Sequence, residues 1–256
     1  MIIFLRKIFF LTFFIILISI NSFSQTKTDT SSLFMINTAY SLQLPGGDLS
    51  NRFGINSAIG LGTMYKTKNN WLLYGFWDYK FGNQLTDEST NIFDNIKTSS
   101  GQIINQDGEY GIIHLSERGF SASINFGKII PVKFESNNYS GLLFYVGPYF
   151  LQHKIYIEND GNNIPEVIGD YRKGYDRLTN GFGINEFIGY IHNSNTQIFN
   201  FFAGFEFSQA FTKNRRSFDF YLRTADTQNR KDYLFSFKVG FNVLLSKRKT
   251  NNYYYF

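Results

Sequence analysis

The sequence of 256 residues contains no cysteine, four prolines and 18% charged residues. Without cysteine, it excludes disulfide bonds, thiolate metal sites, a cysteine nucleophile and the lipid-modified cysteine of bacterial lipoproteins. The net charge of +5 is too small to indicate a nucleic-acid partner. Beyond the N-terminal segment, no apolar run approaches the roughly 18 residues of a membrane-spanning helix.

Aromatic residues are what the sequence has in excess. It contains 30 Phe and 17 Tyr, and 19% of all residues are aromatic, yet the mean hydropathy is only −0.21. This combination is typical of strands in which alternate residues face lipid, with aromatic rings at both membrane–water interfaces.

The N-terminal segment is predicted to be a cleavable export signal. Arg6 and Lys7 precede an apolar stretch that ends near Ile20, and Ser22 and Ser24 are small residues before Gln25. We expect a signal peptide over 1–24, a polar periplasmic lead-in over 25–32 and a periplasmic tail over 246–256. Whether that tail, which ends in Phe256, carries the assembly signal is left open.

Residues 33–245 alternate between apolar and polar side chains, the signature of strands. The clearest cases are 233–245 and 199–211, where apolar and largely aromatic residues occupy one face, and 34–42 and 120–126 follow the same pattern. Further strands are predicted over 54–67, 71–81, 141–157 and 179–191. The total is eight strands, although ten remain possible.

Connection lengths in the predicted strand order alternate between short and long. The short ones are 68–70, 131–140 and 192–196, and the long ones are 43–53, 82–118, 158–178 and 212–231. Short periplasmic turns and long external loops are typical of outer-membrane barrels. We therefore predict an all-β fold: an eight-stranded antiparallel up-and-down transmembrane β-barrel with long extracellular loops.

A closed barrel follows from the physics of lipid, because an open sheet edge would leave unpaired backbone groups in hydrocarbon. Glu206 and Lys238 lie on the polar faces of their strands and are expected to pair in the lumen. An eight-stranded barrel has little interior room, which argues against a general porin.

The signal segment, strand pattern and four long loops resemble those of the OmpA-like and OmpW-like small outer-membrane barrels. The resemblance covers 33–245 and is one of pattern, without a matching motif. It implies integral insertion in the bacterial outer membrane, with lipid and lipopolysaccharide as partners.

A catalytic hypothesis rests on His114 and Ser116, which share one face of a strand, with Glu109 or Glu117 to orient the histidine. The lipid A deacylase barrels use such a His-x-Ser pair, but the surrounding residues do not match that family. We interpret His114 as an ordinary histidine at the rim of a loop.

A second hypothesis concerns the basic connection 212–231. Arg215, Arg216, Arg223 and Arg230 could hold lipopolysaccharide phosphates. The favoured alternative is charge balance with acidic residues of other loops. Segment 158–163 has oxygen ligands suited to Ca²⁺, but a solvated turn is favoured, so no metal site and no cofactor is predicted.

The sequence therefore favours a non-enzymatic outer-membrane barrel with a structural or protein-interaction role, such as a subunit of an envelope or secretion complex. Two alternatives remain: a lipid A-modifying hydrolase using His114 and Ser116, and a small OmpW-like channel. A soluble β-sandwich is the competing fold.

Overall fold

The computed structural model describes residues 31–132, 140–194 and 200–245. The predicted signal peptide, most of the lead-in and the C-terminal tail lie outside these residues. Within the described part of the chain, no helix is long and apolar enough to cross a membrane.

Eight antiparallel strands close into one barrel in sequence order. They are β1 (Leu33–Gly47), β2 (Asn56–Lys66), β3 (Trp71–Gly82), β4 (Ile113–Pro131), β5 (Gly141–Asn159), β6 (Thr179–Asn193), β7 (Asn200–Asn214) and β8 (Asn229–Leu244). The predicted all-β, eight-stranded, up-and-down fold is confirmed, because the strands of the described residues close into a ring of eight rather than ten and do not form two stacked sheets. This is the architecture of the small bacterial outer-membrane barrels.

The barrel closes where β1 pairs with both β2 and β8. Ala39 illustrates the closure, since it lies opposite Gly60 on one side and Gly240 on the other. Every strand therefore has two hydrogen-bonded neighbours, which satisfies the backbone groups that lipid could not.

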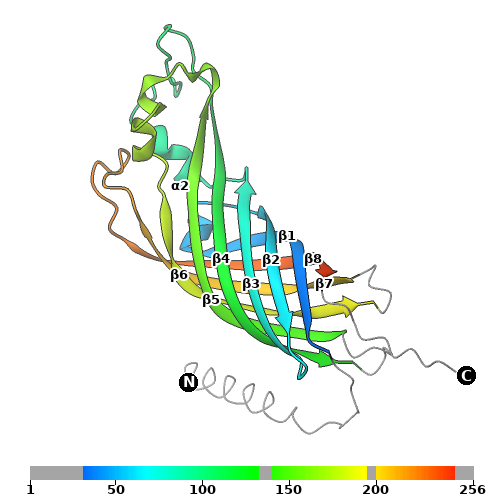
Figure 1. Cartoon of the computed structure of the whole chain (residues 1–256). Coiled ribbons are helices and arrows are strands. Elements are labelled where there is room, and N and C mark those ends of the chain that lie inside the picture. Colours follow the sequence, from blue (N-terminus) through cyan, green and yellow to red (C-terminus); the bar gives the residue numbers. More distant parts are fainter. Residues whose placement is uncertain (1–30, 133–139, 195–199, 246–256) are drawn as a thin grey trace, which may run out of the picture.

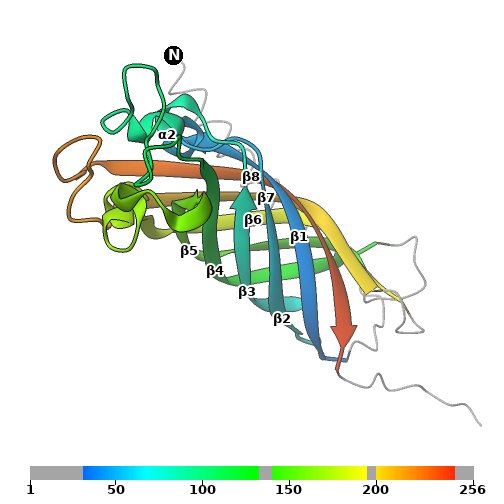
Figure 2. The same cartoon turned by 90° about the horizontal axis from the view of Figure 1, so that it is seen from above.

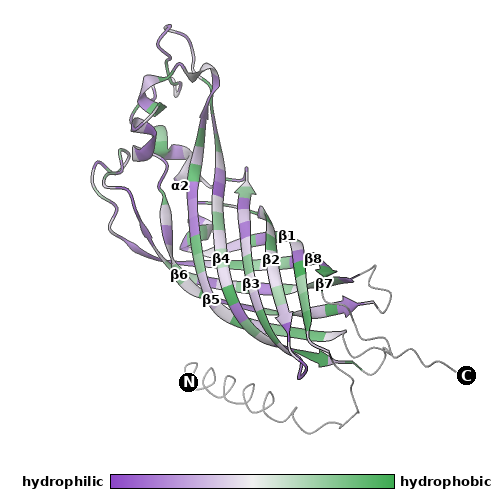
Figure 3. Cartoon of the chain, viewed as in Figure 1, coloured by the Kyte–Doolittle hydropathy of each residue, from purple (hydrophilic) through white to green (hydrophobic). Residues whose placement is uncertain are grey.

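Side chains alternate strictly between the two faces of the barrel wall. On β8, Phe235, Phe237 and Phe241 point outward and are exposed, whereas Ser236 and Lys238 point inward and are buried. The same alternation holds on β1, whose burial pattern changes at every residue from Leu33 to Leu44. The predicted apolar faces are thus the outer faces, and Figure 3 shows the apolar positions along the strands.

Several strands are longer than the sequence predicted. The connections at one end are 48–55, 83–112, 160–178 and 215–228 rather than 43–53, 82–118, 158–178 and 212–231. β4 differs most, because it begins at Ile113 and pairs with the far end of β5 up to Asn159. At this end of β4 and β5 the backbone pairing continues although the outward side chains are no longer apolar. The alternation of apolar and polar residues, from which the strands were predicted, therefore ends before the strands do.

These four connections gather at one end of the barrel, as Figures 1 and 2 show from two directions. We call them the cap. The cap contains short helical turns: η2 (Asp48–Asn51), α2 (Asp87–Thr90), η3 (Asn91–Phe93), η4 (Asp160–Asn162), η5 (Pro165–Val167) and η6 (Tyr171–Gly174). β4 and β5 extend from the barrel wall into the cap (Figure 1).

Candidate functional site

The half of the lumen away from the cap is filled by a layer of aromatic and apolar side chains. Tyr74 of β3 contacts Tyr145 of β5 and Phe202 of β7, with ring centroids 5.2 and 6.5 Å apart. Tyr145 stacks on Phe187 of β6 at 4.6 Å. These rings come from four strands and reach across the interior, so they form a plug.

Glycines on the inner wall make room for this plug. A Cβ atom on Gly204 would lie 2.6 Å from the Phe187 ring, and one on Gly240 would lie 2.3 Å from the Phe202 ring. Gly60 and Gly62 make room in the same way, since a Cβ on either would lie within 2.7 Å of Phe76. Ring and glycine are therefore matched in shape on neighbouring strands of the inner wall.

A charged layer lies beside the plug, inside the barrel. The Lys238 ammonium donates to Glu206 Oε2 at 2.6 Å, and the same oxygen accepts hydrogen bonds from the Tyr145 hydroxyl and the Asn185 amide. The Lys238 Nζ also lies 4.1 Å from the Phe76 ring centroid. The structure thus brings together the two residues that the sequence placed in the lumen.

Similar pairs lie closer to the cap. Lys80 contacts Asp78 at 3.0 Å and donates to Gln43 at 3.1 Å. The His153 Nε2 lies 3.0 Å from Asp232 Oδ2, joining β5 to β8 across the interior. Each buried charge therefore has an opposite charge or a polar partner, as a low-dielectric interior requires.

The mouth of the barrel is closed by a buried ion-pair cluster. Asp226 accepts a hydrogen bond of 2.6 Å from Arg230 and lies 3.5 Å from Arg52, which also donates to Thr179 on the opposite wall. Burial, together with the nearby cations Arg230 and Arg177, lowers the pKa of Arg52 to about 10. Arg52 therefore stays charged at neutral pH and holds Asp226 in place.

A second ion-pair cluster joins the other connections above this one. Arg177 lies 3.1 Å from Asp219 and 3.5 Å from Glu88, so it links three of the four connections. Arg216 forms two hydrogen bonds with Asp176. The hydrogen bonds that Arg216 donates to Asp176 raise the pKa of Arg216.

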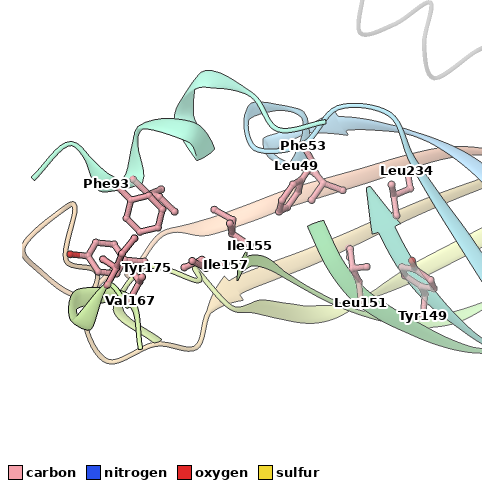
Figure 4. Close-up of a cluster of buried hydrophobic side chains, with 13 residues drawn as sticks. Leu49, Phe53, Phe93, Tyr149, Leu151, Ile155, Ile157, Val167, Tyr175 and Leu234 are labelled. Carbon is pink, nitrogen blue, oxygen red and sulfur yellow. The ribbon is translucent and has the colours of Figure 1, made fainter. Parts of the chain in front are cut away.

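The cap has a hydrophobic core to which three of the four connections contribute buried side chains (Figure 4), and the fourth adds the partly buried Phe220. Leu49 and Phe53 come from the first connection, Phe93 from the second and Tyr175 from the third. Phe220 from the fourth packs against Tyr175 at 5.2 Å. The cap is thus a folded unit that is continuous with the top of the barrel core through Tyr149, Leu151 and Leu234.

The predicted catalytic residues do not assemble. His114 and Ser116 lie on the same face of β4, but Glu117 lies on the opposite face, where it is buried and accepts a 2.7 Å hydrogen bond from Asn56. His114 is exposed and lies 3.6 Å from Asp160. Strand alternation separates Glu117 from the histidine that it would have to orient.

The four arginines of the predicted basic loop also separate. Arg230 points inward to Asp226, and Arg216 is engaged by Asp176. Arg215 is exposed and donates to Asn180 on the outer wall, while Arg223 is exposed in a left-handed turn with φ of 55°. Arg216 therefore pairs with an acidic residue of another connection, as the charge-balance interpretation expects, whereas Arg230 pairs within its own predicted connection.

A different basic row lies on the outer wall just below the cap, and the sequence analysis missed most of it. Its members project outward from β4, β5, β7 and β8 or from just after β7: Arg118, Lys154, Lys213, Arg215 and Lys231. Arg118 and Lys154 are cross-strand partners in a groove of about 540 Å³ that Tyr79 and Phe120 also line. The row appears only when the strand register is known.

Among the described residues, no group of three or more His, Asp or Glu side chains could hold a metal ion. Segment 158–163, considered for Ca²⁺, forms the end of β5 and the turn η4. Its Asn159 amide donates to the carbonyl of Ile164, as in an ordinary turn.

Comparisons with known proteins give a general likeness. No protein-family model and no curated protein matches the chain. Among solved structures, Ail, the attachment invasion locus protein of Yersinia pestis, in complex with the heparin analogue sucrose octasulfate, has a TM-score of 0.43 and 11% identity. A second structure of Ail has a TM-score of 0.41 and 11% identity, and each alignment covers 83% of this chain and 99% of Ail. The fold assignment therefore rests on the strand topology itself.

Proposed function

We propose that this chain is an integral barrel of the bacterial outer membrane that carries a folded cap at the cell surface for contact with another envelope component. The observation that supports this most directly is the cap core, in which side chains from all four connections pack into one cluster. Loops that serve only to join strands need no shared core, whereas a recognition surface needs a rigid support.

The outer wall supports insertion in lipid. Exposed apolar residues surround the barrel, including Leu61 at 61%, Phe205 at 67% and Phe126 at 63% exposed. In water, apolar surface on this scale would be an aggregation liability, whereas in a bilayer it is the required belt. Export by the predicted signal peptide is part of this proposal.

The basic row supports an orientation with the cap outside. Arg118, Lys154 and Lys213 lie just above the aromatic side chains Phe120 and Phe211 on the outer wall. Aromatic rings at the interface with cations just beyond them suit an outer leaflet of phosphorylated lipopolysaccharide.

The filled interior favours a barrel that does not conduct over a channel. The aromatic plug, the paired charges and the mouth cluster of Arg52, Asp226 and Arg230 fill successive levels of the lumen. The position of Glu117 likewise favours a non-enzymatic role over a lipid A hydrolase. Lipid A mass spectra should therefore be identical with the wild-type protein and with Ser116→Ala.

Planar-bilayer recording tests whether the lumen conducts. The wild-type protein should give no stepwise conductance, because the plug, the paired charges and the mouth cluster each fill a level of the lumen. Regular conductance steps from the wild type would contradict a non-conducting lumen.

Shortening the second connection tests the role of the cap. Replacing 84–111 with a short Gly-Asn turn removes Ile92 and Phe93 from the cap core. The barrel should keep its shifted mobility on unboiled gels, while any envelope protein that co-purifies with the full chain in mild detergent should be lost. Equal co-purification with the shortened chain would place recognition elsewhere.

A further inference from the structure

One side chain on the outer wall conflicts with a simple lipid-facing surface. Glu186 of β6 is exposed and projects outward, in the middle of an apolar row formed by Phe182, Ile184, Ile188 and Tyr190. The residues opposite it are Val146 on β5 and Phe207 on β7. The carboxyl group is therefore surrounded by lipid-facing apolar side chains on three strands.

Placing the Glu186 carboxyl group among lipid-facing side chains is costly because it lies far from either end of the apolar row. Phe182 and Tyr190 each lie four positions from it along the strand, which is about 13 Å in either direction. A glutamate side chain is too short to reach either interface over that distance. Polar groups inside a membrane are expensive and usually have a partner. Within the described part of the chain, no hydrogen bond or ion pair engages Glu186.

A matching polar group lies next to it on the same wall. Gln209 of β7 points outward and pairs with Ile184, two positions from the register partner of Glu186. Its amide offers both hydrogen-bond donors and an acceptor, which complement a carboxyl group. The two side chains make no hydrogen bond with each other in the structure, so both remain available in the apolar belt.

We propose that the outer wall around Glu186 and Gln209 is the contact surface between two copies of this chain within the membrane. Two barrels inserted in the same direction and related by a two-fold axis along the membrane normal present this wall to each other. Glu186 of each copy then lies beside Gln209 of the other, and the hydrogen bond forms twice. Ile188 and Phe205 supply apolar packing around the polar pair. This proposal rests on membrane insertion, as proposed above.

Disulfide cross-linking tests the contact directly, because the chain has no native cysteine. Ile188→Cys places a thiol on the proposed surface, and the matched control Leu61→Cys places one on β2, where the side chain is equally lipid-facing. Both proteins are reconstituted in phospholipid vesicles at low protein density and oxidised. We expect a dimer of the chain from Ile188→Cys and little from Leu61→Cys.

A second substitution tests the polar pair. Adding Glu186→Leu to Ile188→Cys should lower the dimer yield about ten-fold, since two membrane hydrogen bonds of modest strength are lost. Gln209→Leu should act in the same way, whereas Glu186→Gln should keep most of the dimer because the amide still donates and accepts.

The outcomes are distinguishable. Equal cross-linking at both cysteines, or a dimer that Glu186→Leu does not weaken, would overturn the contact. So would a monomer that still shows the shifted mobility of a folded barrel, and in that case membrane insertion would stand. Loss of the mobility shift in every protein would instead contradict the proposed function.

Discussion

Glu206 of β7 and Lys238 of β8 form an ion pair of 2.6 Å inside the barrel, with both side chains almost fully buried. The carboxylate also accepts hydrogen bonds from Tyr145 and Asn185, so one oxygen organises donors from β5, β6 and β8. This arrangement stabilises the lumen only while both charges are present.

Removing one partner of this pair is expected to be severe. Glu206→Gln leaves the Lys238 ammonium buried without a counter-charge and should lower the free energy of unfolding by about 3–5 kcal/mol. Urea titration of the protein in vesicles measures the change, with fluorescence of Trp71 and Trp77 as the readout. The double replacement of Glu206→Gln and Lys238→Met should lose less than Glu206→Gln alone. If the double variant lost as much free energy of unfolding as Glu206→Gln and Lys238→Met lose when their separate effects are added, the two side chains would act independently.

The alternation of residues made this pair predictable. In a strand of period two, once the apolar face is assigned to lipid, the opposite face must be the lumen. The same reasoning correctly predicted the outer faces of β1, β4, β7 and β8 and the strand order.

The same reasoning could not predict the ion pairs of the cap or the basic row. Arg52 pairs with Asp226, and Arg177 pairs with Asp219, across connections that no periodic pattern links. Likewise, Arg118 and Lys154 become neighbours only through the register of β4 and β5. The sequence grouped Arg215, Arg216, Arg223 and Arg230 because they are close along the chain, and strand alternation then sends Arg230 inward.

A charge placed on the apolar belt tests membrane insertion. Phe205→Arg should lower the free energy of unfolding by roughly 2–4 kcal/mol, because it exposes a guanidinium to hydrocarbon near the middle of β7. Urea unfolding from vesicles measures the effect. Phe218→Arg is the matched control, since Phe218 is an exposed residue of the cap and its replacement should cost little. Equal effects at the two positions would argue that the wall around Phe205 does not face lipid.

The cap should open separately from the barrel. Phe93 is almost fully buried and packs against Tyr175 at 5.0 Å, so Phe93→Ala removes about 3–5 kcal/mol of local packing. Limited proteolysis should then cleave within 83–112 much faster than in the wild type, while the shifted mobility on unboiled gels is unchanged. If Phe93→Ala abolished that mobility shift, the cap and the barrel would instead form one cooperative unit.

The mouth cluster gives the cap a specific dependence on acid. Burial alone would raise the pKa of Asp226, but the hydrogen bonds from Arg230, the Gln228 backbone amide and Asn214 outweigh it and hold that pKa below 3.8. A carboxyl group with a lowered pKa in the folded state stabilises that state above pH 3.8. This contribution falls away as the pH drops through the lowered pKa. Protonation also removes the counter-charge that Arg52 and Arg230 share, and leaves Arg52 only the more distant carboxylate of Glu88 at 4.0 Å.

Resistance of the cap to an acid-active protease should therefore fall below pH 4 in the wild-type protein. Asp226→Asn should show the reduced resistance already at pH 5, with a weaker further loss on acidification. Asp170→Asn is the control, because Asp170 also has a lowered pKa through Lys173 but is fully exposed, and surface ion pairs contribute little. If the two variants had the same profile, the acid dependence would belong to general charge on the cap rather than to the ion-pair cluster at the mouth.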